Sequence, residues 1–248
     1  MGNYSEAALF SSRVPAFTAA NEEVLHGLGG LLVTRFGTAP LAPGRVVAIA
    51  GPGCVGKSTL AEGLAANLRR DHSYDCMAVD LDGYLIEKSQ RERVRPIISG
   101  YDPRGFELIQ AAQDVSRWRG VGQKFQIKIY DKLTSRRPAG EQVDARDLLI
   151  IEGACAFFEP LKSLSDFKVF LFADKRIQFA NRYQREKNDL SRSDAQINAK
   201  FAHLYPDYER YILPTLYLAD VVLQVEENYR LRAWTTADFE GWLRATRR

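Results

Sequence analysis

Residues 51–59 read Gly51-Pro52-Gly53-Cys54-Val55-Gly56-Lys57-Ser58-Thr59 and match the pattern G-x-x-x-x-G-K-[ST] of a phosphate-binding loop. The preceding residues 45–50 have the length and β-branched content of a buried strand. After the loop, Leu60, Leu64 and Leu68 recur every four residues, as on one face of a helix. Strand, loop and helix in this order predict a P-loop that binds a nucleoside triphosphate.

The chemistry of residues 51–59 follows from their types. Glycines allow a tight turn, backbone N–H groups form an anion nest, and a helix N-terminus adds its positive end. We expect Lys57 to reach the β and γ phosphates and the Ser58 hydroxyl to ligate Mg²⁺. The predicted nucleotide-binding residues are Gly51, Gly53, Cys54, Val55, Gly56, Lys57, Ser58 and Thr59. A glycine-rich turn that matches by chance is the alternative, and the flanking strand and helix disfavour it.

The composition excludes several classes of protein. The chain has 248 residues, 46% of them hydrophobic and 26% charged, which is typical of one large soluble domain or a core with an appendage. A net charge of +3 is too small to indicate nucleic-acid or acidic-membrane binding, and no apolar run approaches the length of a membrane span. Cys54, Cys76 and Cys155 are far apart, which predicts no disulfide or zinc framework and a cytoplasmic location.

Residues 1–44 are predicted to form an N-terminal helical extension to a domain at residues 45–248. Apolar residues between Val24 and Phe36 suggest a packed helix, although Gly27, Gly29 and Gly30 weaken that prediction. A structural cap is favoured over a separate functional module.

Two further strand candidates end in acidic residues. Residues 76–80 lead into Asp80-Leu81-Asp82-Gly83-Tyr84, and residues 148–151 lead into Glu152 and Gly153. Open α/β sheets bind ligands at the carboxyl ends of their strands. If the strand at 76–80 neighbours the P-loop strand, Asp82 can face the γ-phosphate and accept a hydroxyl proton, with Asp80 as the second choice. Glu152 would support Mg²⁺. The alternatives are an ordinary Asp-Gly turn and a solvent-exposed acid.

A run of arginines follows the strand candidate at residues 167–173. Asp174 is the expected N-cap of a helix that starts at Lys175. Arginines on such a helix can clamp the charge that builds on a transferring phosphoryl group. The alternative is a solvated helix face. The basic residues concerned are Arg176, Arg182, Arg185, Lys187 and Arg192.

The remaining segments complete an alternating pattern. Phe106, Ile109, Ala112 and Val115 predict an amphipathic helix from Arg104 to about Trp118. Alternation over residues 125–129 predicts a half-exposed strand, with residues 130–138 capping an accessory hairpin. Residues 193–213 carry a helical apolar stripe, residues 221–225 form a last strand candidate, and residues 231–243 suggest a closing helix. Strands alternating with helices predict a doubly wound, mostly parallel α/β sheet.

In order and spacing, these motifs resemble the uridine kinase, phosphoribulokinase and pantothenate kinase group of P-loop kinases, over roughly residues 45–225. The matching pieces are Gly51 to Thr59, Asp82-Gly83-Tyr84-Leu85, Gly100-Tyr101-Asp102-Pro103-Arg104-Gly105-Phe106-Glu107, Tyr130-Asp131, Ile150-Ile151-Glu152-Gly153, Ala173-Asp174-Lys175-Arg176, and Tyr208 to Val222 with Pro214 and Ala219-Asp220.

The resemblance implies an ATP-dependent kinase that phosphorylates a hydroxyl of a small molecule. It implies the P-loop NTPase fold, with five parallel strands, a lid at about residues 175–195 and a small accessory hairpin. Carried over, Asp82 is the catalytic base, Lys57 binds phosphate, Ser58 and Glu152 hold Mg²⁺, and Arg182 and Arg185 are lid arginines. Substrate contacts fall on Asp102, Tyr84, Tyr130, Arg136, Arg137 and Arg176. The oligomeric state stays open to a homodimer or tetramer.

The acceptor is where this sequence departs from the group. Uridine kinases carry a pattern similar to Tyr-Asp-x-x-x-His-x-Arg at the accessory hairpin, and its histidine contacts the pyrimidine. Here Ser135 stands in place of the histidine, and Arg136 and Arg137 follow it. A site without that partner should discriminate poorly for a pyrimidine, and two arginines suit an anionic or carboxylate-bearing acceptor. Uridine-, pantothenate-, glycerate- and sugar-type acceptors stay open. A nucleotide-hydrolysing switch and a non-catalytic ATP-binding regulator are the less favoured alternatives.

Overall fold

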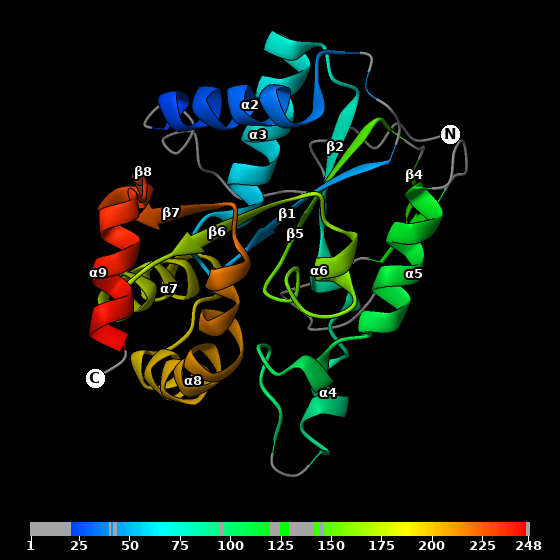
Figure 1. The fold of residues 1–248 in the computed structure, drawn as a ribbon. Coiled ribbons are helices and arrows are strands. Elements are labelled where there is room, and N and C mark those ends of the chain that lie inside the picture. Colours follow the sequence, from blue (N-terminus) through cyan, green and yellow to red (C-terminus); the bar gives the residue numbers. More distant parts are fainter. Residues whose placement is uncertain are drawn as a thin grey trace.

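The described part of the chain is built on a mixed sheet with the strand order β2-β5-β1-β6-β7-β8 (Figure 1). The computed structural model describes residues 21–39, 41, 44–94, 97–119, 125–128, 141–143 and 146–246. Five strands are parallel, and β8 pairs antiparallel with β7 at one edge. The strands are β1 (Arg45–Ala50), β2 (Cys76–Asp80), β5 (Leu148–Glu152), β6 (Phe167–Phe172), β7 (Val221–Val225) and β8 (Leu231–Ala233).

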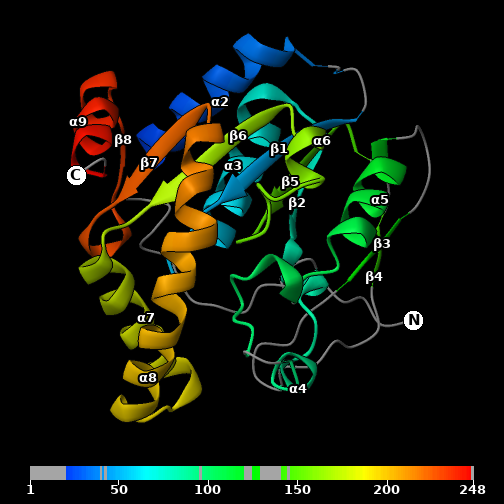
Figure 2. The same cartoon turned by 60° about the horizontal axis from the view of Figure 1, so that its bottom comes forward.

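Helices cover both faces of this sheet, as Figures 1 and 2 show together. Alternate residues of β1 explain why. Val46 and Ala48 pack into one apolar cluster, whereas Val47 and Ile49 pack into the other with Leu60, Leu64 and Leu68 of α3. The helices are α2 (Glu22–Phe36), α3 (Lys57–His72), α4 (Lys88–Arg91), α5 (Leu108–Arg119), α6 (Leu161–Leu164), α7 (Lys175–Leu190), α8 (Asp194–Asp207) and α9 (Thr236–Thr246). The predicted doubly wound α/β fold is confirmed.

One condition placed on the predicted site is wrong. Strand β2 does not neighbour the P-loop strand β1, because β5 lies between them. In the register of the sheet, Glu152 of β5 stands beside both Ile49 of β1 and Asp80 of β2. The three strand ends therefore meet at the same edge, with Glu152 in the middle. Asp82 lies one strand further from the loop, about 5 Å more in the hydrogen-bonding direction.

The predicted helix beginning at Arg104 starts later and buries a different face. Helix α5 begins at Leu108, and Pro103–Gly105 forms a short 3-10 turn (η3) before it. Ile109 is 71% exposed, so its assignment to the buried stripe is wrong. A strict three-residue period drifts around a helix with 3.6 residues per turn, and Phe106 precedes the helix. The buried face carries Ala111, Ala112, Asp114, Val115 and Trp118.

The predicted closing helix is in part a strand. Leu231 begins β8, and α9 starts only at Thr236. Trp234 lies between the two, and its ring packs at a tilt against Phe172 of β6 with 5.0 Å between ring centroids. Three residues are too few to reveal a strand by periodicity.

The predicted accessory hairpin is confirmed at its base. Strands β3 (Phe125–Ile127) and β4 (Glu141–Val143) pair antiparallel as a separate two-stranded sheet. Its predicted tip, residues 130–138, lies outside the described residues.

Helix α2 packs across α3 on one face of the sheet (Figure 1). Leu25, Leu28 and Leu32 of α2 are buried there. The close approach of the two helices requires a glycine at residue 29, because a Cβ there would lie 2.5 Å from Oδ1 of Asn67.

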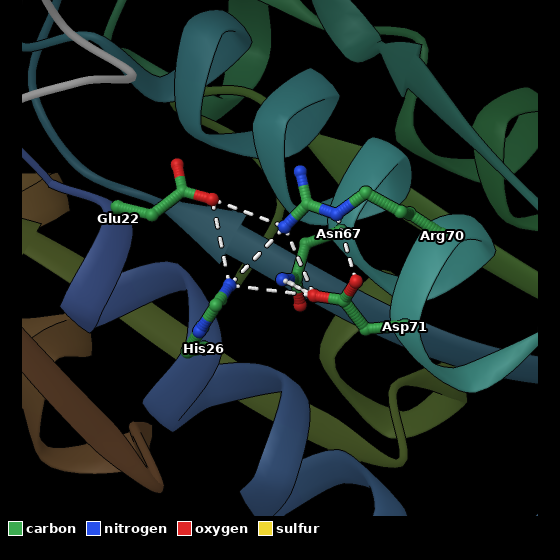
Figure 3. Close-up of polar contacts among 5 residues, drawn as sticks. All are labelled: Glu22, His26, Asn67, Arg70 and Asp71. Atoms are coloured by element: carbon green, nitrogen blue, oxygen red, sulfur yellow. Dashed lines mark hydrogen bonds and ion pairs between the residues drawn. The ribbon is translucent and has the colours of Figure 1, made fainter.

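A polar cluster closes the outer side of the α2–α3 contact, as Figure 3 shows. Arg70 of α3 binds Glu22 of α2 at 3.0 Å and Asp71 at 2.7 Å. His26 lies 3.3 Å from Asp71. The pairs are solvent-accessible, so they add little stability beyond the apolar contact. Within the described residues, no helix combines the length and apolar character needed to cross a membrane.

Candidate functional site

The phosphate-binding loop links the end of β1 to the start of α3, as its sequence predicts. Gly51 has φ 144, and a Cβ there would come 2.4 Å from the Leu171 carbonyl oxygen of β6. Gly56 has φ 89 and leads directly into the helix. Both conformations favour glycine, and the first also leaves no room for a side chain. The loop is thus held against the sheet edge with the N-terminus of a 16-residue helix behind it.

Two predicted phosphate and metal contacts lie together in the loop. Ser58 Oγ donates a hydrogen bond of 2.6 Å to Oε1 of Glu152, which is only 2% exposed. Lys57 Nζ donates to the carbonyl oxygen of Pro52 at 2.8 Å and so folds back over the loop. A hydroxyl beside a carboxylate fits Mg²⁺, which completes its shell with water and phosphate oxygens rather than a full protein cage.

The acids after β2 divide their roles. Asp80 caps the short 3-10 helix η2 (Leu81–Tyr84), since its Oδ1 accepts from the backbone N of Asp82 at 2.7 Å. Asp82 is half-buried, and its charge acts on Arg185 of α7. Burial opposes the Arg185 charge, but Cys54 and Asp82 outweigh it and raise its pKa. Asp82 follows, by two residues, the strand end that stands beside Glu152 in the register of the sheet.

Helix α7 brings Arg182 next to the phosphate loop. Asp174 caps this helix, as expected, by accepting from the backbone N of Ile177 at 2.8 Å. Arg182 is 6% exposed and donates to Glu186 at 2.8 Å. A Cβ on Gly53 would lie 2.8 Å from its guanidinium, which shows how closely the arginine approaches the loop.

Glu186 anchors the basic cluster of α7 and α8. Besides Arg182, it binds Arg192 and Lys200, each at 2.7 Å. Burial opposes the charged form of Glu186, but Lys200, Arg192 and Arg182 outweigh it and lower its pKa to about 2. This cluster positions Arg182 rather than presenting a solvated helix face.

Tyr101 is a site residue that the sequence analysis did not select. Its hydroxyl accepts from the backbone N of Gly53 at 2.6 Å and from Arg182 at 3.2 Å. The motif from Gly100 to Glu107 was recognised, yet only Asp102 was selected from it. A tyrosine in a turn carries no signal of its own, so the contact became visible only in the fold.

Asp102 is buried and already bound. It is 3% exposed, and its carboxylate accepts from the Arg104 backbone N at 2.9 Å and from the Arg104 guanidinium at 2.5 Å. Arg104 accordingly lowers the pKa of Asp102, against the opposing effect of burial. Half of the Arg104 side chain is open, with 57% exposed. The Arg104 guanidinium is therefore more open to solvent than the Asp102 carboxylate that it binds.

The other predicted substrate residues do not gather at the loop. Tyr84 is 2% exposed, and its hydroxyl donates to Asp114 at 2.8 Å inside the core. Arg176 pairs on the surface with Glu227 at 2.8 Å. Tyr130, Arg136 and Arg137 lie outside the described residues. Among the described residues, no cluster of three His, Cys, Asp or Glu side chains could hold a metal ion alone.

Comparisons with known proteins point to one family. The model of the Phosphoribulokinase / Uridine kinase family matches residues 46–231. A uridine kinase of Brevibacillus brevis is 28% identical over 185 residues, or 72% of this chain and 83% of that protein. Uridine kinase-like protein 4 of Arabidopsis thaliana is 25% identical over 181 residues, or 72% of this chain but only 38% of that longer protein.

A solved structure supports the fold. A proposed fructose transport system kinase from Silicibacter sp. TM1040 superposes with a TM-score of 0.65 over 80% of this chain and 98% of that one, at 23% sequence identity.

Proposed function

We propose that this chain transfers the γ-phosphate of ATP to a small-molecule alcohol. The chain belongs to the phosphoribulokinase / uridine kinase family and is a phosphotransferase that acts on a hydroxyl group. ATP would bind with its phosphates in the loop at residues 51–59. Ser58 and Glu152 would hold Mg²⁺, which neutralises phosphate charge when bound.

The observation that carries this proposal is the hydrogen bond of 2.6 Å between Ser58 of the phosphate loop and the buried Glu152. Asp80 pairs with Glu152 in the register of the sheet, and Asp82 follows it by two residues, which supports a role for Asp82 near the phosphates. Asp82 would orient the acceptor hydroxyl and take its proton. Lys57, Arg182 and Arg185 would counter the negative charge of the transferring phosphoryl group, which is the main protein contribution in such reactions.

For the acceptor, we propose a small alcohol that carries a carboxylate, of the glycerate or pantothenate type. The exposed guanidinium of Arg104 supports this choice, since a planar guanidinium pairs well with a carboxylate. In the sequence, Ser135 replaces the histidine of uridine kinases, and Arg136 and Arg137 follow it. A pyrimidine nucleoside is the alternative, favoured by the names of the relatives.

The variant Asp82→Asn tests the role of the base. It should keep ATP affinity within about threefold and lose roughly 100-fold or more in kcat, because general-base catalysis contributes factors of this size. Asp75→Asn is the matched control, since Asp75 flanks the opposite end of β2 and pairs with Arg146 at 2.9 Å. The readouts are ATP binding and the rate of product formation. An unchanged kcat in Asp82→Asn would remove Asp82 from the mechanism.

A further inference from the structure

One hydroxyl oxygen joins three parts of the site. The Tyr101 oxygen accepts from the backbone N of Gly53, in the phosphate loop, at 2.6 Å. It also accepts from Arg182, on helix α7, at 3.2 Å. Tyr101 itself belongs to the turn that carries Asp102 and Arg104. The phosphate loop, helix α7 and the turn that carries Asp102 and Arg104 therefore meet at a single oxygen atom.

The Tyr101 ring is fixed in this position. The residue is 6% exposed, and its ring packs edge-on against Tyr208 with 6.4 Å between ring centroids. Its backbone N donates to Oγ of Ser99, itself 2% exposed, at 3.0 Å. Gly53 completes the fit, since a Cβ at residue 53 would lie 3.1 Å from the hydroxyl oxygen. A fixed ring delivers its hydroxyl at low entropic cost.

The hydrogen-bonding capacity of this hydroxyl is only partly used. A tyrosine hydroxyl can accept two hydrogen bonds and donate one. Gly53 and Arg182 use both acceptor positions, because a backbone N–H and a guanidinium can only donate. Among the described residues, no acceptor is recorded for the hydroxyl hydrogen. The hydroxyl therefore keeps one donor position beside the phosphate loop.

We propose that Tyr101 is a positioning residue for phosphoryl transfer, which orients the Gly53 N–H of the phosphate loop and the Arg182 guanidinium through its hydroxyl oxygen. This inference rests on the proposed function, since it concerns the same loop and lid. Without the oxygen, Arg182 keeps its ion pair with Glu186 of its own helix but loses the hydrogen bond to Tyr101. The partly buried Gly53 N–H loses its acceptor as well.

Tyr101→Phe removes this oxygen and leaves the ring in place. Hydrogen bonds to charged groups are worth about 1.5–3 kcal/mol, so kcat should fall about 10- to 100-fold while the KM of the acceptor changes less than about threefold. Tyr74→Phe is the matched control, because Tyr74 is equally buried and its hydroxyl donates to the Gly37 carbonyl, away from the loop. A purely structural role would lower Tm and leave kcat unchanged well below Tm, and that result would overturn the proposal.

A double-mutant cycle tests whether Tyr101 acts through Arg182. If it does, the kcat of the double variant Tyr101→Phe/Arg182→Lys should lie within about threefold of the kcat of Arg182→Lys alone. The reason is that effects through a shared contact do not multiply. Fully multiplicative losses would contradict the proposal.

A nucleotide-binding measurement separates this proposal from the proposed function. Titration with Mg·ATP in the absence of any acceptor needs no turnover. Tyr101→Phe should weaken binding at least about threefold relative to Tyr74→Phe, through the lost orientation of Gly53. Equal affinities would overturn the positioning role. Failure to find a phosphorylated acceptor, with ATP affinity still sensitive to Tyr101, would instead count against the proposed function alone.

Discussion

The phosphate loop and the turn that follows residue 100 hold their polar groups in different ways. In the loop, Lys57 rests on the Pro52 carbonyl and Ser58 on Glu152, contacts that a phosphate or Mg²⁺ can replace. In the turn, Asp102 is locked to Arg104 by several hydrogen bonds. The contacts in the loop are single hydrogen bonds, whereas the carboxylate in the turn is held by several hydrogen bonds from one guanidinium. Tyr101 connects the two.

The largest expected effect comes from Glu186→Gln, which removes the carboxylate that holds Arg182 beside the phosphate loop. This change leaves Arg182, Arg192 and Lys200 around a neutral amide. Removing one partner of a buried ion pair costs about 3–5 kcal/mol, so Tm should drop clearly and kcat should fall as Arg182 loosens. Denaturant unfolding and steady-state rates are the measurements. Arg176→Gln serves as the surface control, since its pair with Glu227 is exposed.

The same glutamate predicts a pH dependence. The pKa of Glu186 falls from 4.5 to about 2 on folding. A lowered carboxylate pKa adds stability that is fully present above pH 4.5 and is lost as the pH falls toward 2. The free energy of unfolding should therefore decline less steeply over this range in Glu186→Gln than in the wild type. Identical slopes would show that Glu186 does not carry the acid sensitivity.

An intermediate effect is expected on the turn side from Arg104→Gln. If the guanidinium meets a carboxylate on the acceptor, the acceptor KM should rise about tenfold or more, while the KM of ATP stays within about twofold. Arg91→Gln, on the nearby α4 segment, is a suitable control. An equal rise in the KM of the acceptor and the KM of ATP would show that Arg104 does not bind the acceptor specifically. The loop and the turn would then not differ in function as proposed.

The smallest effects lie away from both regions, in α2. Gly30 has open space around it, so Gly30→Ala should stabilise the helix by about 0.5–1 kcal/mol. Gly29→Ala should destabilise by about 1–3 kcal/mol, because its Cβ would meet Asn67. Thermal unfolding distinguishes the pair, and kcat should stay unchanged in both. Equal stability changes would mean that α2 does not approach α3 this closely.

The sequence predicted the elements of the sheet better than their arrangement. Five strand candidates were found because buried strands leave runs of apolar, β-branched residues. The insertion of β5 between β1 and β2 could not be predicted, since strand order depends on long-range pairing. The hidden strand β8 and the exposed Ile109 show the same limit, because short or irregular segments take their form from their neighbours.

The site divides in a similar way. Lys57 and Ser58 are predicted from a motif whose chemistry is local, Glu152 is predicted from the acidic end of a strand, and the structure joins Ser58 to Glu152 by a hydrogen bond. Arg182 and Arg185 are predicted from a charge run, and only the packing of the folded chain shows that Arg182 reaches the loop. Tyr101 was missed because its partners, Gly53 and Arg182, lie far away in the sequence. The roles of all these residues stay predictions until they are tested.

The most direct test of phosphoryl transfer to an alcohol is product mass after incubation with Mg·ATP and a panel of nucleosides, pantothenate, glycerate, sugars and sugar phosphates. We predict that one hydroxyl compound, carrying a carboxylate, gains the mass of one phosphate group, and that Asp82→Asn abolishes this product. Equal loss of ATP with and without every compound, and no phosphorylated product, would contradict the account.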